Sequence, residues 1–289
     1  GDGKSGNSVV ALLDEATAVA GDPVAVRAAI DRRARGAAAP HKPLDAQLAA
    51  RVQSLRERFD LWGTGERPEG FVAPTRNDAL AAWRQLGGEA CVLEALLPLD
   101  CEVSVVLARD ATGVTACFPI AENSHRHGIL DVSIVPARIS AALSESARQC
   151  ALRIAVALDY IGTLGVEFFI SRGVLYVNEM APRPHNSGHY TLDACTTSQY
   201  EQQVRALCGL PLGSPALTSP AVMVNLLGDL WSAGEPQWSE LLCWPNLRLH
   251  LYGKQEARPG RKMGHFTVLD PDLAQAVATA RDARATMGI

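Results

Sequence analysis

Polar side chains that could bind an anion and a divalent cation crowd into the segment NEMAPRPHNSGH, residues Asn178–His189. It contains two candidate metal ligands, a guanidinium, two imidazoles, an amide and a hydroxyl: Asn178, Glu179, Arg183, His185, His189, Asn186 and Ser187. The apolar run Val174–Val177 before it is typical of a buried strand. Polar groups this dense at the end of a strand are costly to bury unless they bind something. Because Pro182 and Pro184 break the strand, we expect a rigid, donor-rich loop beside the Glu179 carboxylate.

A second carboxylate, Glu167, lies on the run Leu164–Ile170, which precedes the run Val174–Met180 across the turn Ser171-Arg172-Gly173. If the turn has three residues, Glu167 and Glu179 share one face of a hairpin, and a two-residue turn would place them on opposite faces. Unpaired carboxylates on one face repel each other, and Mg²⁺ between them reverses the repulsion. The pair therefore indicates either a metal site or two solvated carboxylates.

A basic cluster, YGKQEARPGRKMGH, surrounds a Pro-Gly turn and contains Lys254, Arg261, Lys262 and His265. Arginine can bind a phosphate with two parallel hydrogen bonds, and lysine acts on it as a point charge. The local sequence leaves two readings open, a phosphate clamp or an ordinary solvated basic loop.

A third polar segment, ENSHRHGIL at Glu122–Leu130, places Asn123, His125 and His127 ahead of a glycine turn. A single histidine is more often structural than catalytic. Taken alone, this segment therefore supports either role.

The elements that must position these residues alternate irregularly. Runs rich in β-branched residues predict strands at 90–96, 102–108, 113–118, 164–170, 174–180, 221–227 and 247–253. Helices are predicted at 78–86, 138–158, 199–208 and from 271 onward, and apolar spacing predicts another over 44–59. Because strict βαβ alternation is missing, we predict an α+β fold with an antiparallel sheet that holds the 164–180 hairpin.

The composition is that of an ordinary globular chain, with 289 residues, 47% hydrophobic and 20% charged. A net charge of −4 argues against a nucleic-acid surface. No apolar run approaches the roughly 20 residues that a membrane span needs. The 7 cysteines are scattered without a CxxC pair, which favours reduced thiols and a cytoplasmic location.

Together these segments resemble the carboxyaminoimidazole ribonucleotide synthetases, ATP-grasp enzymes of purine biosynthesis, from about Phe71 to Gly264. The blocks that carry the resemblance are VLEALLPLDCEVSV, ENSHRHGIL, GTLGVEFF, NEMAPRPHNSGHYT, SQYEQQVRALCGLPLG, VMVNLLGD and YGK…RKMGH. Other ATP-grasp ligases share a carboxylate-plus-Asn metal site, but they lack the full APRPHNSGHYT run. The resemblance implies an ATP-grasp domain with an antiparallel sheet and a small C-terminal α/β module.

The resemblance also assigns roles to residues of this sequence. The expected ATP-binding residues are Glu94 and Leu97 for the adenine, Glu102 for the ribose, and His125, Asn178 and Glu179. The expected Mg²⁺ ligands are Glu167 and Glu179. The expected catalytic loop, facing bicarbonate and aminoimidazole ribonucleotide, is Arg183, His185, Asn186 and Ser187. The expected clamp for the ribonucleotide phosphate is Lys254, Arg261 and Lys262.

The implied enzyme is an ATP-dependent ligase with two steps. Bicarbonate attacks the γ-phosphorus of ATP to give carboxyphosphate, and the amine of aminoimidazole ribonucleotide then captures the carboxyl unit. Such chemistry depends on in-line positioning and charge neutralisation. The expected partners are these small molecules together with ATP and Mg²⁺, not nucleic acid or a membrane, and a homodimer is compatible with the resemblance.

The sequence departs from the family near its start. We expect residues 1–50 to be a divergent helical remnant with the Rossmann-like domain of the family largely missing, 51–217 the ATP-grasp domain, and 218–289 a family-specific C-terminal domain. The two nucleotide lysines of the family are absent from the aligned positions. Either the chain binds ATP poorly, as a non-catalytic ribonucleotide-binding member would, or Arg56, Arg58 and Arg67 replace the lysines. An ATP-grasp ligase for another amine is a third reading.

Overall fold

The computed structural model describes residues 9–14, 17–21, 60–62, 75–85, 92–94 and 96–289. The chain divides into two compact units, Gly1–Leu99 and Asp100–Ile289. Nearly all the predicted site residues belong to the second unit.

The first unit contains two antiparallel strand pairs and one described helix. Its elements are β1 (Val9–Asp14) paired with β2 (Thr17–Gly21), β3 (Asp60–Trp62) paired with β4 (Val92–Glu94), and α3 (Arg76–Gln85). Residues 9–21 thus form a hairpin where a helical remnant was predicted, and the helix predicted over 44–59 lies outside the described residues. Helix α3 begins at Arg76, two residues before the predicted start at residue 78, because Thr75 and Asp78 exchange hydrogen bonds in a capping box.

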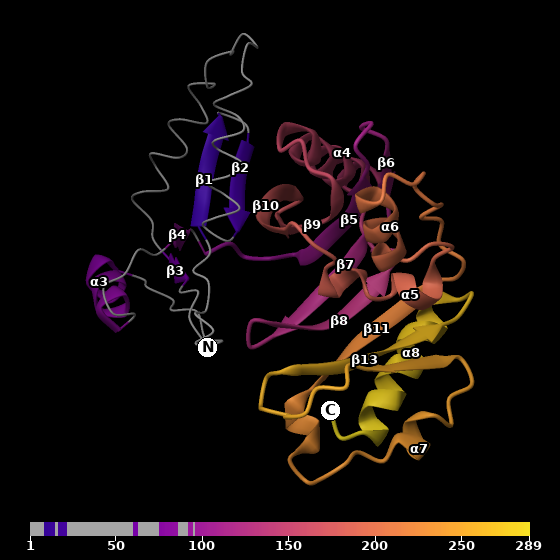
Figure 1. Ribbon diagram of the computed structural model, residues 1–289. Coiled ribbons are helices and arrows are strands. Elements are labelled where there is room, and N and C mark those ends of the chain that lie inside the picture. Colours follow the sequence, from indigo (N-terminus) through magenta and orange to yellow (C-terminus); the bar gives the residue numbers. More distant parts are fainter. Residues whose placement is uncertain (1–8, 15–16, 22–59, 63–74, 86–91, 95) are drawn as a thin grey trace. The chain divides into compact units, whose positions relative to one another are not determined.

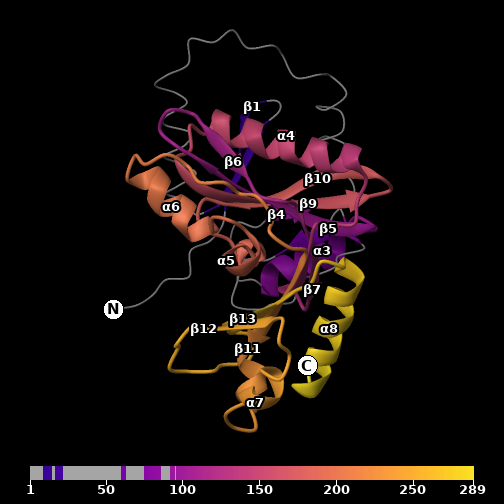
Figure 2. The same cartoon turned by 90° about the vertical axis from the view of Figure 1, so that its right-hand side faces the viewer.

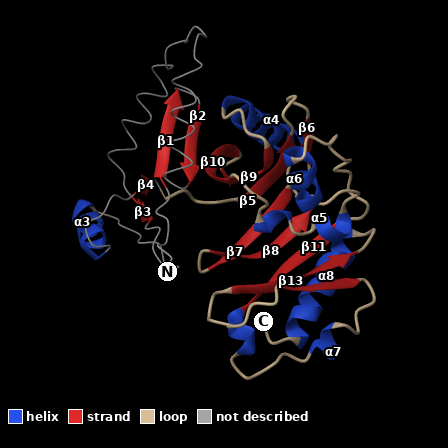
Figure 3. Cartoon of the chain, in the orientation of Figure 1, coloured by secondary structure: helices blue, strands red, loops and turns tan. Residues whose placement is uncertain are grey.

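The second unit is built on a nine-stranded antiparallel sheet in the order β10-β9-β5-β7-β8-β11-β13-β12, with β6 paired to β5 (Figures 1 and 3). Its strands are β5 (Cys101–Arg109), β6 (Thr115–Cys117), β7 (Ala121–Arg126), β8 (Ile129–Val135), β9 (Gly162–Ser171), β10 (Val174–Ala181), β11 (Ala221–Leu227), β12 (Leu247–Leu251) and β13 (Lys262–Leu269). The antiparallel sheet expected from the sequence is confirmed.

Helices cover both faces of this sheet. They are α4 (Ala141–Ala157), the 3₁₀ turn η1 (Asn186–Gly188), α5 (Thr191–Ala194), α6 (Gln199–Leu207), the 3₁₀ turn η2 (Gly228–Trp231), α7 (Trp238–Leu241) and α8 (Leu273–Thr286). Helices α4 and α6 lie on opposite sides of strands β5 and β9 (Figure 2). Ser140, Ser198 and Asp272 cap the N-termini of α4, α6 and α8 with their side chains.

One face of the sheet packs apolar side chains against α8, and the opposite face carries a group of polar residues. Under α8, the apolar face buries Val222, Val224, Phe266 and Val268 against alanines of the helix. The opposite face carries Ser104, Asn123, Ser133 and Glu167, and we call it the site face. Register fixes this grouping, because Ser104 pairs with Glu167 and Asn123 pairs with Ser133.

The hairpin of β9 and β10 differs from the predicted one at its turn. Val174 pairs with Ser171, so the turn has two residues, Arg172 and Gly173, with φ of 51° and 71°. Positive φ at both positions is the geometry of a type I′ turn. The structure therefore has the two-residue alternative, and without a further irregularity Glu179 would face away from Glu167.

Strands β7, β8 and β13 are not predicted by the sequence pattern. The polar stretch Ala121–Arg126 contains Glu, Asn, Ser, His and Arg, and it pairs on both sides inside the sheet. Its side chains alternate between the two faces, and Glu122, Asn123 and His125 find polar partners on neighbouring segments. The predicted boundary between residues 217 and 218 falls in the connection between α6 and β11. Among the described residues, no helix is long and apolar enough to cross a membrane.

Candidate functional site

Two β-bulges bring charged residues onto the site face. Between Val177 and Met180 the register of β10 against β9 shifts by one residue, so Glu179 as well as Asn178 opposes Glu167. A second shift between Leu226 and Leu227 leaves Met263 as the extra residue of β13 and turns Lys262 to the same face. Bulges are over-represented next to active sites because they re-aim a side chain in this way.

Glu167 and Glu179 form a carboxylate pair at the edge of the site. Ligand atoms of Glu167, Glu179 and His185 all lie within 4.8 Å of one another. Burial, and then repulsion from Glu179, raise the pKa of Glu167 to about 7. A cation between the two carboxylates would relieve that repulsion, and oxygen ligands of this kind suit Mg²⁺. The residues present therefore fit the Mg²⁺ that the family resemblance implies, and the two carboxylates meet despite the two-residue turn.

A chain of buried hydrogen bonds sets the orientation of His185. Ser133 Oγ donates to Asn123 Oδ1, Asn123 Nδ2 donates to Ser104 Oγ, and Ser104 Oγ donates to Ser187 Oγ, over distances of 2.8, 2.9 and 2.7 Å. Ser187 Oγ lies 2.9 Å from His185 Nδ1, and the Ser187 backbone N–H also donates to that nitrogen. Since Nδ1 accepts, the ring proton resides on Nε2, which lies 3.5 Å from Glu167 Oε1. His185 therefore donates toward the carboxylate pair and does not itself ligate a cation there.

Gln199 binds the backbone of the loop that carries His185. The sequence pattern does not identify Gln199 as a site residue. Gln199 Oε1 accepts from the His185 backbone N–H, and Gln199 Nε2 donates to the His185 carbonyl, both at 2.8 Å. The Gln199 side chain is fully buried. Gly165 leaves room for the same loop, because a Cβ there would lie 2.7 Å from the His185 Cβ. Only the sequence position of Gln199, beside the Ser198 helix cap, could have drawn attention to it.

Asn186 and Arg183 complete the predicted catalytic loop. The Asn186 side chain is 7% exposed, and neither its Nδ2 nor its Oδ1 has a hydrogen-bond partner. Buried amides are nearly always paired, so this orphaned amide is suited to an absent ligand. Arg183 is exposed, and it donates from Nη1 to the Pro184 carbonyl. The loop therefore offers both a neutral donor-acceptor group and a guanidinium.

Two of the predicted nucleotide residues meet across the sheet. His125 Nδ1 lies 2.7 Å from Glu102 Oε2 in a half-buried ion pair. Burial lowers the pKa of His125, but the hydrogen bond and charge of Glu102 outweigh it, so the pKa is raised. Asn178 lies in β10, and Leu97 follows β4 in the first unit. Glu94 ends β4, with its side chain outside the described residues.

The basic cluster is arranged around the start of β13. Lys254 Nζ donates to the Lys262 carbonyl at 2.5 Å, and Arg261 Nη1 donates to the Glu256 carbonyl at 2.9 Å. Burial lowers the pKa of Lys262, while the charge of Glu167 opposes that shift. The pKa of Lys254 is lowered by burial and by the nearby Arg261. Lys262 thus links the predicted phosphate clamp to the carboxylate pair.

Three histidines, two buried and one partly buried, stay neutral near pH 7. Burial lowers the pKa of His185 to about 3, that of His189 to about 4 and that of His265 to about 2. Nearby cations, chiefly Lys262, add to the shift of the first two.

We expect the free energy of unfolding to fall as the pH drops from about 6.5 to 5. The unfolded chain would protonate these histidines below their ordinary pKa of 6.5, whereas the folded chain keeps them neutral, so acid favours unfolding. Glu167 and His125 oppose this trend, because their raised pKa values let the folded state bind more protons at these two groups than the unfolded chain does, but they are two groups against three. Urea denaturation midpoints at pH 7, 6 and 5 measure the effect. A midpoint that stays constant or rises toward pH 5 would contradict it.

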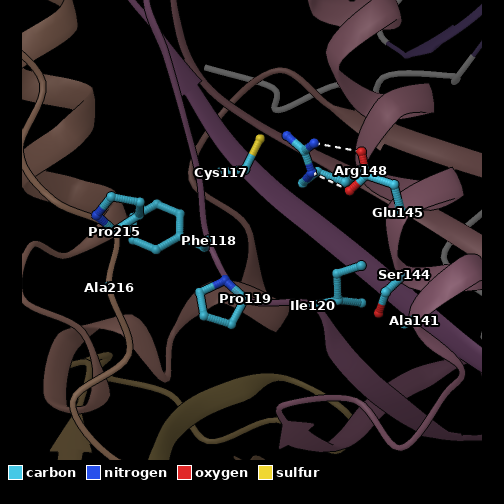
Figure 4. Close-up of a pocket in the computed structure, with 10 residues that line it drawn as sticks. All are labelled: Cys117, Phe118, Pro119, Ile120, Ala141, Ser144, Glu145, Arg148, Pro215 and Ala216. Carbon is cyan, nitrogen blue, oxygen red and sulfur yellow. Dashed lines mark hydrogen bonds and ion pairs between the residues drawn. The ribbon is translucent and has the colours of Figure 1, made fainter.

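A separate hollow lies between α4, the segment after β6 and the connection that follows α6. Cys117, Phe118, Pro119 and Ile120 line one wall, and the Glu145–Arg148 ion pair of α4 lies along the other (Figure 4). Burial raises the pKa of the Cys117 thiol. The lining is largely apolar and brings no further predicted site residue into the hollow.

Comparison with known proteins divides the chain into two matched regions. The family described as ATP-grasp domain matches residues 67–200, and the family described as phosphoribosylaminoimidazole carboxylase C-terminal domain matches residues 221–279. Among curated relatives, N5-carboxyaminoimidazole ribonucleotide synthase of Bacillus subtilis is 49% identical over 224 residues, covering 77% of this chain and 57% of the relative. The Brucella melitensis enzyme is 48% identical over 194 residues, covering 67% and 52%.

Solved structures agree with this division. The Thermus thermophilus N5-carboxyaminoimidazole ribonucleotide synthetase superposes with a TM-score of 0.72 at 40% identity, covering 83% of this chain and 64% of that one. The Aspergillus clavatus synthase, solved with ADP and 5-aminoimidazole ribonucleotide, has a TM-score of 0.72 at 28% identity, with coverage of 84% and 65%. This chain therefore spans little more than half to two thirds of its relatives. The chain therefore carries an ATP-grasp domain and a phosphoribosylaminoimidazole carboxylase C-terminal domain, and over the part that it spans it is similar to the N5-carboxyaminoimidazole ribonucleotide synthases.

Proposed function

We propose that this chain is an ATP-dependent ligase that carboxylates the amine of 5-aminoimidazole ribonucleotide with bicarbonate, in purine biosynthesis. The observation that carries the proposal is the orphaned Asn186 amide, buried on the same short loop as His185 and the Arg183 guanidinium, beside the paired carboxylates. A small polar anion bound at this loop would satisfy the amide and meet positive charge. Bicarbonate has that size and charge.

In the proposed reaction, a bicarbonate oxygen attacks the γ-phosphorus of ATP, ADP leaves, and carboxyphosphate forms. The substrate amine then attacks the carboxyl carbon, inorganic phosphate leaves, and the nitrogen loses one proton. Mg²⁺ held by Glu167 and Glu179 would neutralise charge on the phosphates. Arg183 would stabilise the anion, and Asn186 and Ser187 would orient it. His185, with its proton on Nε2, would hold the Glu167 carboxylate in place.

The remaining predicted residues take up the rest of the two substrates in this proposal. On the nucleotide side these are Glu94, Leu97, Glu102, His125 and Asn178. On the ribonucleotide side they are Lys254, Arg261 and Lys262. The 2.7 Å Glu102–His125 pair supports the first group, and the contact of Lys254 with Lys262 supports the second. We also propose that the chain divides into an N-terminal remnant at 1–50, an ATP-grasp domain at 51–217 and a family-specific C-terminal domain at 218–289.

The direct test supplies purified protein with ATP, Mg²⁺, bicarbonate and aminoimidazole ribonucleotide and measures ADP release. We expect release that depends on the ribonucleotide and is lost in Arg183→Ala. Arg172→Ala, which changes an exposed arginine in the turn between β9 and β10, is the matched control and should retain the activity. Release of ADP at the blank rate, with or without ribonucleotide, would overturn the proposal.

A second candidate is a non-catalytic family member that binds only the ribonucleotide. It is favoured by the two missing nucleotide lysines, and the arginines that could replace them lie outside the described residues. Calorimetry separates the two candidates. Ribonucleotide binding without measurable Mg·ATP binding would support the second, and tight Mg·ATP binding would exclude it.

Two further expectations are kept as proposals. A cytoplasmic location is supported by the six described cysteines, which are all free thiols. A homodimer rests on the family resemblance alone.

A further inference from the structure

Asp193, His250 and His265 converge at a place that the proposed reaction does not use. Each offers a ligand atom, and these atoms lie within 4.8 Å of one another. Strands β12 and β13 place His250 directly opposite His265, and α5 supplies Asp193. The three residues come from separate elements, so their convergence is a product of the fold.

One nitrogen in this cluster has no partner. His265 is 1% exposed, and its Nδ1 lies 2.9 Å from the Tyr252 hydroxyl. Its Nε2 is buried without any hydrogen bond. A buried ring nitrogen left unpaired is costly and calls for an explanation such as a bound ion.

We propose that Asp193, His250 and His265 bind a divalent transition-metal cation of the Zn²⁺ type. Two imidazoles and one carboxylate suit Zn²⁺, whereas the oxygen pair Glu167 and Glu179 suits Mg²⁺. The Tyr252 hydroxyl stands where a ligating histidine normally finds the partner that orients its ring. The site is distinct from the carboxylate pair in position and in ligand type, and it does not depend on the proposed function.

Small movements would complete the coordination. Asp193 Oδ2 and His250 Nε2 are now 2.9 Å apart, and ligand atoms around Zn²⁺ at bonds of about 2.0–2.1 Å are roughly 3.3 Å apart. The two imidazoles are stacked with centroids 4.6 Å apart and planes 16° apart, so they must tilt to point at one ion. The His250 side chain is 33% exposed and can make that movement. The same exposure gives the ion a path from solvent and leaves room for a water ligand.

A cation bound by Asp193, His250 and His265 would link helix α5 to strands β12 and β13. Helix α5 directly follows the loop that ends at His189, whose ring lies 5.0 Å from that of His265. Binding should therefore raise the thermal stability of the unit and restrain the end of the loop, since an ion that binds only the folded state stabilises it.

The experiment titrates the full chain with Zn²⁺ by calorimetry and records the melting temperature. It uses a Cys208→Ser/Cys243→Ser background, because both thiols are exposed. We expect one ion per chain, a higher melting temperature, and at least a tenfold loss of affinity in His265→Gln and in Asp193→Asn. Mg²⁺ should give no such shift at this site. His127→Gln, which changes an exposed turn histidine, is the matched control and should bind as the background does.

Other outcomes would overturn the proposal. They are no Zn²⁺ binding by the background protein, affinity unchanged in both ligand variants, or binding lost in Glu167→Gln instead. If His265→Gln fails to fold, His250→Asn replaces it, since His250 is partly exposed. The visible spectrum of bound Co²⁺ gives a further check: strong absorption that is lost in His250→Asn supports nitrogen coordination, and weak absorption equal in both proteins contradicts it.

Discussion

Glu179→Gln is expected to abolish Mg²⁺-dependent nucleotide binding while leaving the protein folded. The substitution removes one of two ligand charges, and a neutral amide is a poor replacement for a carboxylate around Mg²⁺. It also removes the repulsion that helps to raise the pKa of Glu167, so apo stability should stay equal or rise slightly. Ribonucleotide affinity, assigned to the basic cluster around Lys262, should change far less.

Melting temperatures with and without Mg·ATP measure this effect, because a ligand that binds the folded state raises the midpoint. Glu201→Gln is the matched control: it removes an exposed carboxylate that pairs with Arg205 within α6, and it should keep the full shift. A Glu179 variant that unfolds outright would make Glu179 structural. One that keeps the whole Mg·ATP shift would place the metal elsewhere.

The hairpin of β9 and β10 shows which features of the candidate site can be predicted from the sequence. Both strands are predictable from their sequence pattern, and the pairing of Glu167 with Glu179 is implied only by the family resemblance. The actual route to that pairing is not predictable: a type I′ turn at Arg172-Gly173 sets one register, and a bulge at Asn178–Glu179 corrects it by one residue. Turn length and bulge position act together, and each alone gives the wrong face.

The position of Lys262, toward the other end of the sheet, is likewise not predictable from the local sequence. Its segment reads as a basic turn, yet it opens the buried strand β13, and the bulge at Met263 turns it toward the carboxylates. Strand β7 is also not recognisable from the sequence, because its polar residue Asn123 is buried in a chain of hydrogen bonds that other strands complete. Local composition cannot reveal partners that other strands supply.

The positions of the helices are easier to predict from the sequence than those of the strands. The predicted ranges 138–158 and 199–208 agree with α4 and α6 to within a few residues, since serine caps and apolar spacing act locally. The function of α6 was not predictable. Its first residue, Gln199, reaches the backbone of a loop that comes earlier in the chain, and only the packing of α6 on the site face brings the two together.

Gln199→Ala is therefore expected to lower kcat about 100-fold, since small displacements of positioning groups cost that much. The His185 N–H and carbonyl would lose their partners inside the protein, and the loop that carries Arg183 and Asn186 would shift to recover them. We also expect a stability loss of about 2–4 kcal/mol, from two unsatisfied buried groups. Steady-state kinetics and urea denaturation measure the two effects.

Gln202→Ala provides a control matched in type, helix and burial. Gln202 is also fully buried in α6, and its amide holds the backbone N–H and carbonyl of Gly213 just as Gln199 holds those of His185. Gly213 lies in the connection after α6, so this variant should lose similar stability and keep most of its kcat. Equal kcat losses in both variants would mean that general destabilisation, and not the position of the loop, lowers the rate. An unchanged kcat in Gln199→Ala would show that the position of His185 does not depend on the hydrogen bonds from Gln199.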